Sequence, residues 1–217
     1  MALVLVSSAS LLSVGGTGGV VSRAMAGEAH VAIAIFGDAE FAALAMDEGW
    51  PGAGTPEDPY IIQGLDIATA DSYAISVSST NVSFVVTGCS LVGSFGAVHL
   101  TEVRNCTFHG NELLGAHYAV IMSGSDAVTV TNNTCSVTTT GLSLSECHGA
   151  VVANNTISME LGLGIQISDC VNATIRANAM AGCGIVIHPW HLENDVSHVI
   201  TSDNTVGGRP VYYFSGE

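Results

Sequence analysis

The chain contains no lysine, and its basic side chains other than histidine are four arginines: Arg23, Arg104, Arg176 and Arg209. Nineteen acidic residues give the 217-residue chain a formal net charge of −15 at pH 7. Nucleic acid phosphates are bound by clustered cations, and anionic membrane surfaces attract the same kind of patch. We therefore expect neither a nucleic acid nor an anionic lipid surface as a partner.

Charged residues are scarce altogether, at 11% of the chain, against about 25% in an average soluble protein. Hydrophobic residues make up 48%, and the mean hydropathy is +0.47. This composition excludes intrinsic disorder of the polar, charged kind. The length predicts one domain, or two at most.

The sequence also lacks an apolar run long enough to cross a bilayer, which requires about 20 residues. The apolar stretch over residues 3–12 is shorter, and Ala24-Met25-Ala26 has the small-x-small pattern that precedes a signal-peptidase cut. We interpret residues 1–26 as a signal peptide, although its usual basic start is missing. We therefore expect an exported protein without a transmembrane helix, located outside the cell, at the cell surface or in the periplasm.

The most informative feature is an internal repeat. Asparagines recur at steps of 22, 22 and 23 residues, at Asn111, Asn133, Asn155 and Asn178, and Asn204 holds the same place in a further copy. A second motif keeps step with the first, and its central residues are Ile75, Val98, Val120, Leu142, Ile165 and Ile185. Each repeat holds two short aliphatic stretches of alternating polarity and no ten-residue helical pattern. Residues 60–217 are therefore predicted to form an all-β parallel solenoid of about six rungs.

Stacking of rungs about 4.8 Å apart brings equivalent residues together. We predict inward apolar columns, one of which contains Phe84, Cys106, Val128, Ala150, Ala173 and Val199. The asparagine column lies at a turn, where stacked amides hydrogen-bond to one another and to the backbone. Its predicted role is structural.

Residues 27–59 are predicted to form an N-terminal cap and the loop that leads into the repeats. A strand over residues 31–36 precedes a helix over 38–48, with Asp38 capping the first free N–H groups and Gly49 ending the helix. No polar closing element is visible at the other end. A partner covers the last rung, or the sequence is a piece of a longer protein.

GWPGAGTPEDPYIIQGLDI (49–67), the Asn-Asn rungs and NTVGGRPVYYF (204–214) resemble NosD-like proteins common at archaeal cell surfaces. These share the solenoid of carbohydrate-binding and sugar-hydrolase (CASH) proteins. The resemblance covers roughly residues 30–217 and implies a right-handed, single-stranded, pectate-lyase-like β-helix, export, and contact with carbohydrate or other surface polymers. Some members assist copper insertion into nitrous oxide reductase. No family motif assigns an active site here.

Six cysteines in an exported chain suggest disulfides. Cys106 and Cys135, however, fall in inward columns, where a thiol packs as a small hydrophobic group. Cys147 and Cys170 are predicted to stack on neighbouring rungs within disulfide range. A bridge between them and a pair of free thiols are both consistent with the sequence.

One segment breaks the repeat, because the step from Asn178 to Asn204 is 26 residues. It contains His188, His191 and His198, and imidazoles are ligands for copper or zinc. A loop inserted into a rigid scaffold is a usual place for function. We take these histidines as candidate metal ligands, with a solvated loop as the alternative. His99 and His109 are predicted to point outward from separate columns.

The acidic residues of the rungs, Glu102, Asp126, Glu146 and Asp169, fall mostly near one turn. Glu146 and Asp169 form the best pair for a glycosidase or for Ca²⁺. A lyase would need a basic residue that abstracts a proton. Lysine is absent, and Arg176 and Arg104 are single candidates without an obvious acidic cluster in adjacent rungs. We assign no catalytic residue and favour a function other than catalysis. The first hypothesis is an exported module that binds carbohydrate or acts as a scaffold. The alternatives are a copper-handling accessory domain and a polysaccharide lyase or glycoside hydrolase.

Overall fold

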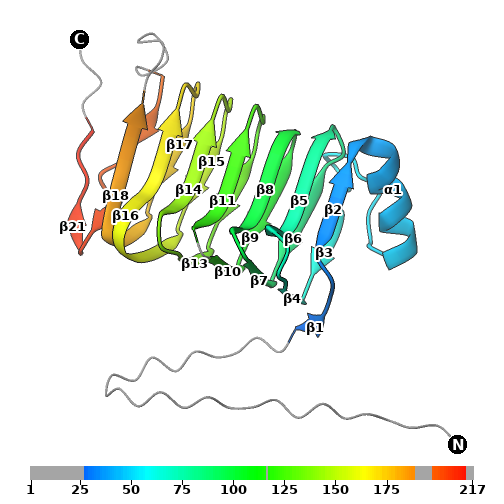
Figure 1. The fold of residues 1–217 in the computed structure, drawn as a ribbon. Coiled ribbons are helices and arrows are strands. Elements are labelled where there is room, and N and C mark those ends of the chain that lie inside the picture. Colours follow the sequence, from blue (N-terminus) through cyan, green and yellow to red (C-terminus); the bar gives the residue numbers. More distant parts are fainter. Residues whose placement is uncertain (1–26, 116, 189–196, 214–217) are drawn as a thin grey trace, which may run out of the picture.

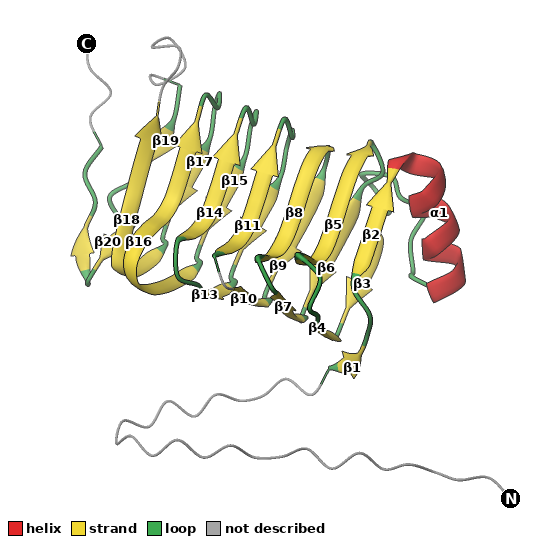
Figure 2. Ribbon diagram, in the orientation of Figure 1, coloured by secondary structure: helices red, strands yellow, loops and turns green. Residues whose placement is uncertain are grey.

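The chain winds as a solenoid of parallel strands, with one helix at its N-terminal end (Figures 1 and 2). The computed structural model describes residues 27–115, 117–188 and 197–213, so the predicted signal peptide lies outside the described residues. One sheet has seven strands: β3 (Tyr60–Gln63), β6 (Phe84–Thr87), β9 (Cys106–His109), β12 (Thr129–Thr131), β15 (Val151–Ala153), β17 (Thr174–Arg176) and β19 (Val199–Ile200).

The second sheet has 14 strands and covers two faces, because β16 and β18 continue around the corner between them. Its first face contains β1 (Glu28–Ala29), β4 (Leu65–Ala68), β7 (Ser90–Gly93), β10 (Glu112–Gly115), β13 (Thr134–Ser136), β16 (Thr156–Ser168), β18 (Ala179–His188) and β20 (Thr205–Val206). Its other face contains β2 (Ile33–Phe36), β5 (Tyr73–Thr80), β8 (Gly96–Val103), β11 (Tyr118–Ser123), β14 (Thr140–Ser145) and the second halves of β16 and β18. The short β21 (Arg209–Pro210) pairs antiparallel with β20.

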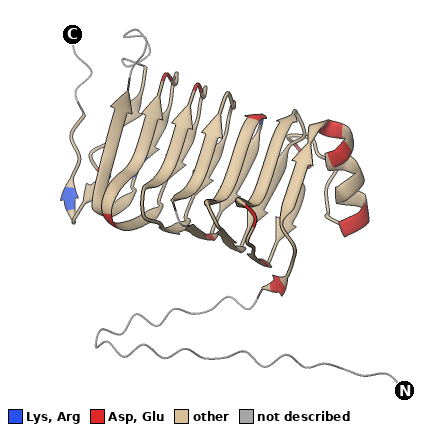
Figure 3. Ribbon diagram, viewed as in Figure 1, with Lys and Arg blue, Asp and Glu red and all other residues tan. Residues whose placement is uncertain are grey.

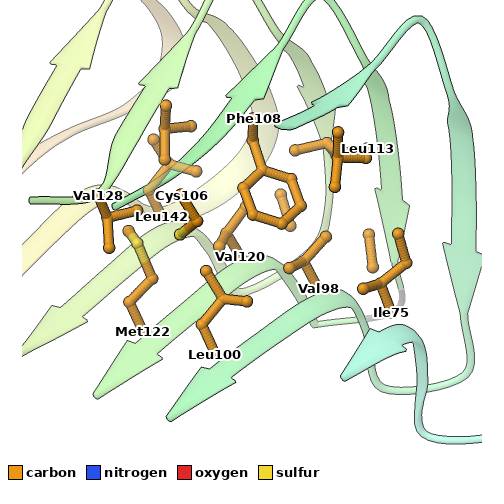
Figure 4. Packing of buried hydrophobic residues seen from close by; sticks show 14 of the residues in the cluster. Ile75, Val98, Leu100, Cys106, Phe108, Leu113, Val120, Met122, Val128 and Leu142 are labelled. Atoms are coloured by element: carbon orange, nitrogen blue, oxygen red, sulfur yellow. The ribbon is translucent and has the colours of Figure 1, made fainter. Parts of the chain in front are cut away.

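The register of the strands is the one that the repeat predicts. Ile75 pairs with Val98, Val98 with Val120, and Val120 with Leu142. These side chains are fully buried and stack inside the solenoid (Figure 4). The parallel β-solenoid of about six turns is confirmed.

The asparagines of the repeat form a buried ladder along the solenoid. Each Nδ2 donates to Oδ1 of the next asparagine at 2.9–3.0 Å, from Asn111 through Asn133, Asn155 and Asn178 to Asn204. Each Oδ1 also accepts the backbone N–H of the preceding ladder residue, beginning with Cys89. The predicted structural role is confirmed, because these amides satisfy backbone groups that the turn would otherwise bury unpaired.

The residue before the ladder position adopts a left-handed conformation on five rungs. Its φ lies between 53° and 65° at Gly88, Gly110, Asn132, Asn154 and Ala177. Glycine and asparagine tolerate this region better than other residues. Glycine or asparagine in front of the ladder residue therefore favours this corner on four rungs, and Ala177 adopts the same conformation on a fifth.

One predicted column is wrong at its last member. Thr174 pairs with Val199, so the residue beside Ala173 on the next rung is His198. His198 is 7% exposed and Val199 is 54% exposed. The inward position of this rung is therefore held by a histidine.

The helix α1 (Gly37–Glu48) covers the N-terminal end of the solenoid (Figure 2). Phe41 is fully buried, stacks against Tyr60 at a ring distance of 5.7 Å and lies 5.0 Å from the ring of Phe84. Gly49 ends the helix in the left-handed conformation, as predicted. Among the described residues no helix is long and apolar enough to span a bilayer.

The predicted capping role of Asp38 is wrong. Phe36 is the N-cap residue and makes no side-chain cap hydrogen bond, while its backbone N–H donates to Oε2 of Glu40 at 2.9 Å. Oδ1 of Asp38 instead accepts hydrogen bonds from the Thr80 hydroxyl (2.7 Å) and the Asn81 backbone N–H (2.8 Å). These hydrogen bonds of Asp38 therefore connect α1 to the turn after β5.

Candidate functional site

The structure describes two of the three predicted metal ligands, His188 and His198, on either side of residues 189–196. His188 is exposed at the end of β18, and His191 lies outside the described residues. His198 is buried beside Ala173, whose backbone N–H donates to its Nδ1 at 3.3 Å. Over the described ranges, no three side chains of His, Cys, Asp or Glu gather into a metal site. The metal assignment of this loop remains a prediction.

The acidic residues occupy two neighbouring corner columns. Glu102, Glu146 and Asp169 share a column and have positive φ, between 51° and 53°. Asp126 lies in the other column, 3.5 Å from Nε of Arg104 and 3.0 Å from Nδ1 of His148. Figure 3 shows that many acidic residues lie at such turns and on α1. A glycosidase places two carboxyl groups on opposite sides of a sugar ring, whereas these carboxylates stack along one edge.

All six cysteines are buried and free in the structure. The backbone N–H of Cys147 donates to Sγ of Cys170 at 3.4 Å, which confirms that the two residues stack. Burial raises the pKa of the Cys106 thiol, and it raises the pKa of Cys135 to about 12. These two thiols are protonated at neutral pH and serve as core side chains.

A cluster of aromatic rings lies at the outer corner where β5, β8 and β11 begin. We call it the aromatic ledge, and it consists of Tyr73, Phe95, His99, His117 and Tyr118. Phe95 is 39% exposed and His117 is exposed, while the other three rings are half-buried. The ledge spans three successive rungs, because Tyr73 pairs with Gly96 and Gly96 with Tyr118.

The rings of the ledge support one another. Tyr73 stacks on His99 at 4.7 Å, and Phe95 lies 5.8 Å from Tyr73. Phe95 also lies 5.3 Å from the rings of both His117 and Tyr118. Gly96 provides the room, because a Cβ there would come within 3.2 Å of the Tyr73 ring. Partial burial lowers the pKa of His99, which favours the neutral form of its ring.

A groove continues along the same corner on the later rungs. It has a volume of about 590 Å³, and its walls include Val137, Thr138, Met159, Leu161 and Gly182. Thr139, which follows this wall, hydrogen-bonds through its Oγ1 to Nδ1 of His117 at 3.2 Å. The ledge and the groove therefore form one edge of the solenoid.

Sequence reasoning missed the ledge, although a signal was present. The motif copies YAISV and YAVIM both begin with tyrosine, and Phe95 and His117 each precede a motif copy. Gly96 stands where YAISV and YAVIM have tyrosine. The first position of the motif therefore varies, and the column of aromatic residues is hard to recognise in the sequence. The positions of His99 and His109 in separate outward columns are confirmed.

Comparison with known proteins places this solenoid among related sequences. No curated protein matches the chain. A crystal structure assigned as a glycosyl hydrolase from Parabacteroides merdae is similar over 65% of this chain and 82% of that one, at 10% identity and a TM-score of 0.44. The family described as "Periplasmic copper-binding protein (NosD)" matches residues 55–206. This match spans well over half of the chain, which therefore belongs to the NosD family.

Proposed function

We propose that this chain is an exported β-helix module that binds a carbohydrate polymer along the edge formed by the aromatic ledge and the groove. The observation that carries the proposal is the ledge itself. Four of its rings lie at one outer corner and are exposed or only half-buried: Tyr73, Phe95, His117 and Tyr118. Aromatic rings that are partly exposed on a rigid scaffold typically serve recognition.

The chemistry of the edge fits a sugar chain. Aromatic faces stack on the apolar C–H faces of sugar rings, while nearby polar groups bind the hydroxyls. His117 supplies such a polar group on the edge, and Ser158 adds a hydroxyl in the groove wall. The net charge of −15 repels polyanions, so the proposed ligand is a neutral polysaccharide.

The test is the removal of one exposed ring. Phe95→Ala is expected to weaken binding to a neutral glycan about tenfold, because one stacked ring contributes about 1.4 kcal/mol. The matched control is Phe36→Ala, since Phe36 is 69% exposed on β2, outside the ledge. A glycan array identifies the ligand, and affinity electrophoresis measures both variants. Equal binding by both variants, or no binding by the native chain across the array, would refute the proposal.

Copper handling is the second candidate, and membership in the NosD family supports it. The segment from the end of β18 to the residue before β19 contains His188, His191 and His198, and imidazole nitrogen is a suitable copper ligand. In this proposal the three histidines would hold the ion at the end of the solenoid. The double variant His188→Ala/His191→Ala is expected to lose copper binding, with His109→Ala as the exposed control. Unchanged titration of the double variant would remove this loop as the site.

A further inference from the structure

Five Asn-x-Ser/Thr triplets, the acceptor sequence for N-linked glycans, lie at the turns of the solenoid. The asparagines of all five are exposed: Asn81, Asn105, Asn132, Asn154 and Asn172. The asparagines of the ladder, by contrast, are at most 3% exposed. The turns therefore carry two kinds of asparagine, a buried set that holds the backbone and an exposed set that solvent reaches.

Turn geometry permits asparagine at these exposed positions but does not require it. Four of the five have a left-handed φ, between 51° and 57°: Asn105, Asn132, Asn154 and Asn172. Other rungs place glycine or alanine at the same two corners, at Gly88, Gly110, Ala127, Gly149 and Ala177. Threonine follows two residues after each of the four asparagines, whereas serine or threonine follows only two of the five glycine and alanine residues. The hydroxyl thus accompanies the asparagine more closely than the turn alone explains.

Two of the triplets expose both side chains that a glycan transferase must reach in the folded chain. In triplets 132–134 and 154–156 the asparagine and the threonine are both exposed. In triplet 81–83 the hydroxyl is out of reach, because Ser83 is 1% exposed. In triplets 105–107 and 172–174 the threonine is half-buried. Exposure therefore favours the first two triplets over the other three.

We propose that Asn132 and Asn154 are acceptors for N-linked glycans. The proposal rests on the export proposed above, since such glycans belong to surface turns of secreted proteins. The donor is an oligosaccharide esterified through its first sugar to a lipid phosphate. Nδ2 of asparagine forms a bond to C1 of that sugar, and the bond from C1 to the phosphate oxygen breaks. The lipid phosphate leaves with the bonding electron pair, and one Nδ2 proton passes to a base of the transferase.

The location of these two residues suits a bulky, solubilising group. They lie at the corner between β12 and β13 and between β15 and β16. None of the five triplets includes a residue of the aromatic ledge or of the groove, so glycans leave the proposed carbohydrate-binding edge free. Only 11% of the chain is charged and the mean hydropathy is +0.47. Attached sugars would add hydration that the side chains supply sparingly.

The test is the intact mass of the full chain, produced in its own organism and purified from the exported fraction. The native chain is expected to be heavier than its amino acids account for. Thr134→Ala and Thr156→Ala are each expected to lose the mass of one glycan, whereas Thr156→Ser keeps its triplet and its glycan. The matched control is Thr129→Ala, which follows the left-handed Ala127 and leaves every triplet intact. Its mass is expected to carry the same glycans as the native chain.

The outcomes separate the glycans from export. An exported native chain with the mass of the bare polypeptide would overturn the glycan proposal and leave export standing. Retention of an unmodified chain inside the cell would overturn both. Fragmentation of glycopeptides by electron transfer locates the sugars, which are expected on Asn132 and Asn154. Glycans confined to the other three triplets would refute the assignment.

Discussion

Asparagine side chains determine the turn of each rung at the scale of single residues. Asn133 makes four ladder hydrogen bonds: its Nδ2 donates to Phe108 O and Asn155 Oδ1, and its Oδ1 accepts from two donors of Asn111. All of these groups are buried, so water cannot replace a lost partner. The repeat predicted this role because the spacing alone places the amides above one another.

Asn133→Ala is expected to lower the free energy of unfolding by about 3 kcal/mol, since it leaves several buried polar groups without partners. Thr134→Ala, at the exposed neighbouring position, is expected to change it by less than about 0.5 kcal/mol. Urea denaturation of both variants measures the difference. Similar midpoints for the two would show that the ladder contributes little.

Backbone strain provides a second test at this scale. Ala177 has a φ of 53° at a corner position that other rungs fill with glycine or asparagine. Left-handed geometry costs a residue with a Cβ about 1–2 kcal/mol, and glycine loses about 0.5–1 kcal/mol through chain entropy. Ala177→Gly is therefore expected to stabilise the chain by about 0.5–1 kcal/mol.

The same substitution two residues later, Ala179→Gly on the extended strand β18, is expected to destabilise by about 0.5–1 kcal/mol. Thermal melting compares the two glycine variants. A shift of the same sign in both would contradict the conformational explanation.

At the scale of elements, hydrogen bonds of Asp38 attach the N-terminal cap to the solenoid, and local sequence rules do not predict them. The helix end at Gly49 was predictable, because a left-handed glycine closes the last turn within a few residues. Asp38 looked like a capping residue, but its partners Thr80 and Asn81 lie more than 40 positions away. Only the folded arrangement brings β5 beside α1.

The attachment of the cap is expected to depend on pH. Hydrogen bonds from Thr80 and Asn81 hold the pKa of Asp38 below its usual value of 3.8. A carboxyl group with a lowered folded-state pKa contributes stability above its unfolded pKa and loses it as the pH falls through the folded value. The contribution is therefore present above about pH 4 and disappears in more acidic solution.

Asp38→Asn is expected to reduce the difference in melting temperature between pH 6 and pH 3, because the amide does not titrate. Asp47→Asn, on the exposed surface of α1, serves as the control. An unchanged difference in Asp38→Asn would show that the acid sensitivity arises elsewhere.

The rung that contains His198 shows why one core position could not be predicted from the sequence. The period placed Val199 in the core, and the structure places His198 there, one residue earlier. The loop after β18 adds residues to this rung, and a count of residues cannot tell how many of them belong to the loop. The aromatic ledge was missed for a related reason, since its column is interrupted by Gly96.

At the scale of the whole molecule, repetition makes the fold predictable and the function less so. The β-solenoid follows from columns of like residues, because each repeat of the sequence predicts the same strands and turns. The rungs differ at Phe95, in the proposed carbohydrate site, and in the segment from His188 to His198, the proposed copper site. Such differences carry no period, so only the folded chain shows which of them lie together.

The stacking of equivalent residues is tested most directly by proton NMR of the chain with ¹⁵N-labelled asparagine. The account predicts nuclear Overhauser contacts from the side-chain amide of Asn111 to Asn133, and onward through Asn155 and Asn178 to Asn204. It also predicts slow exchange of these amide protons with solvent. Rapidly exchanging side-chain amides without contacts from one asparagine to the next would contradict it.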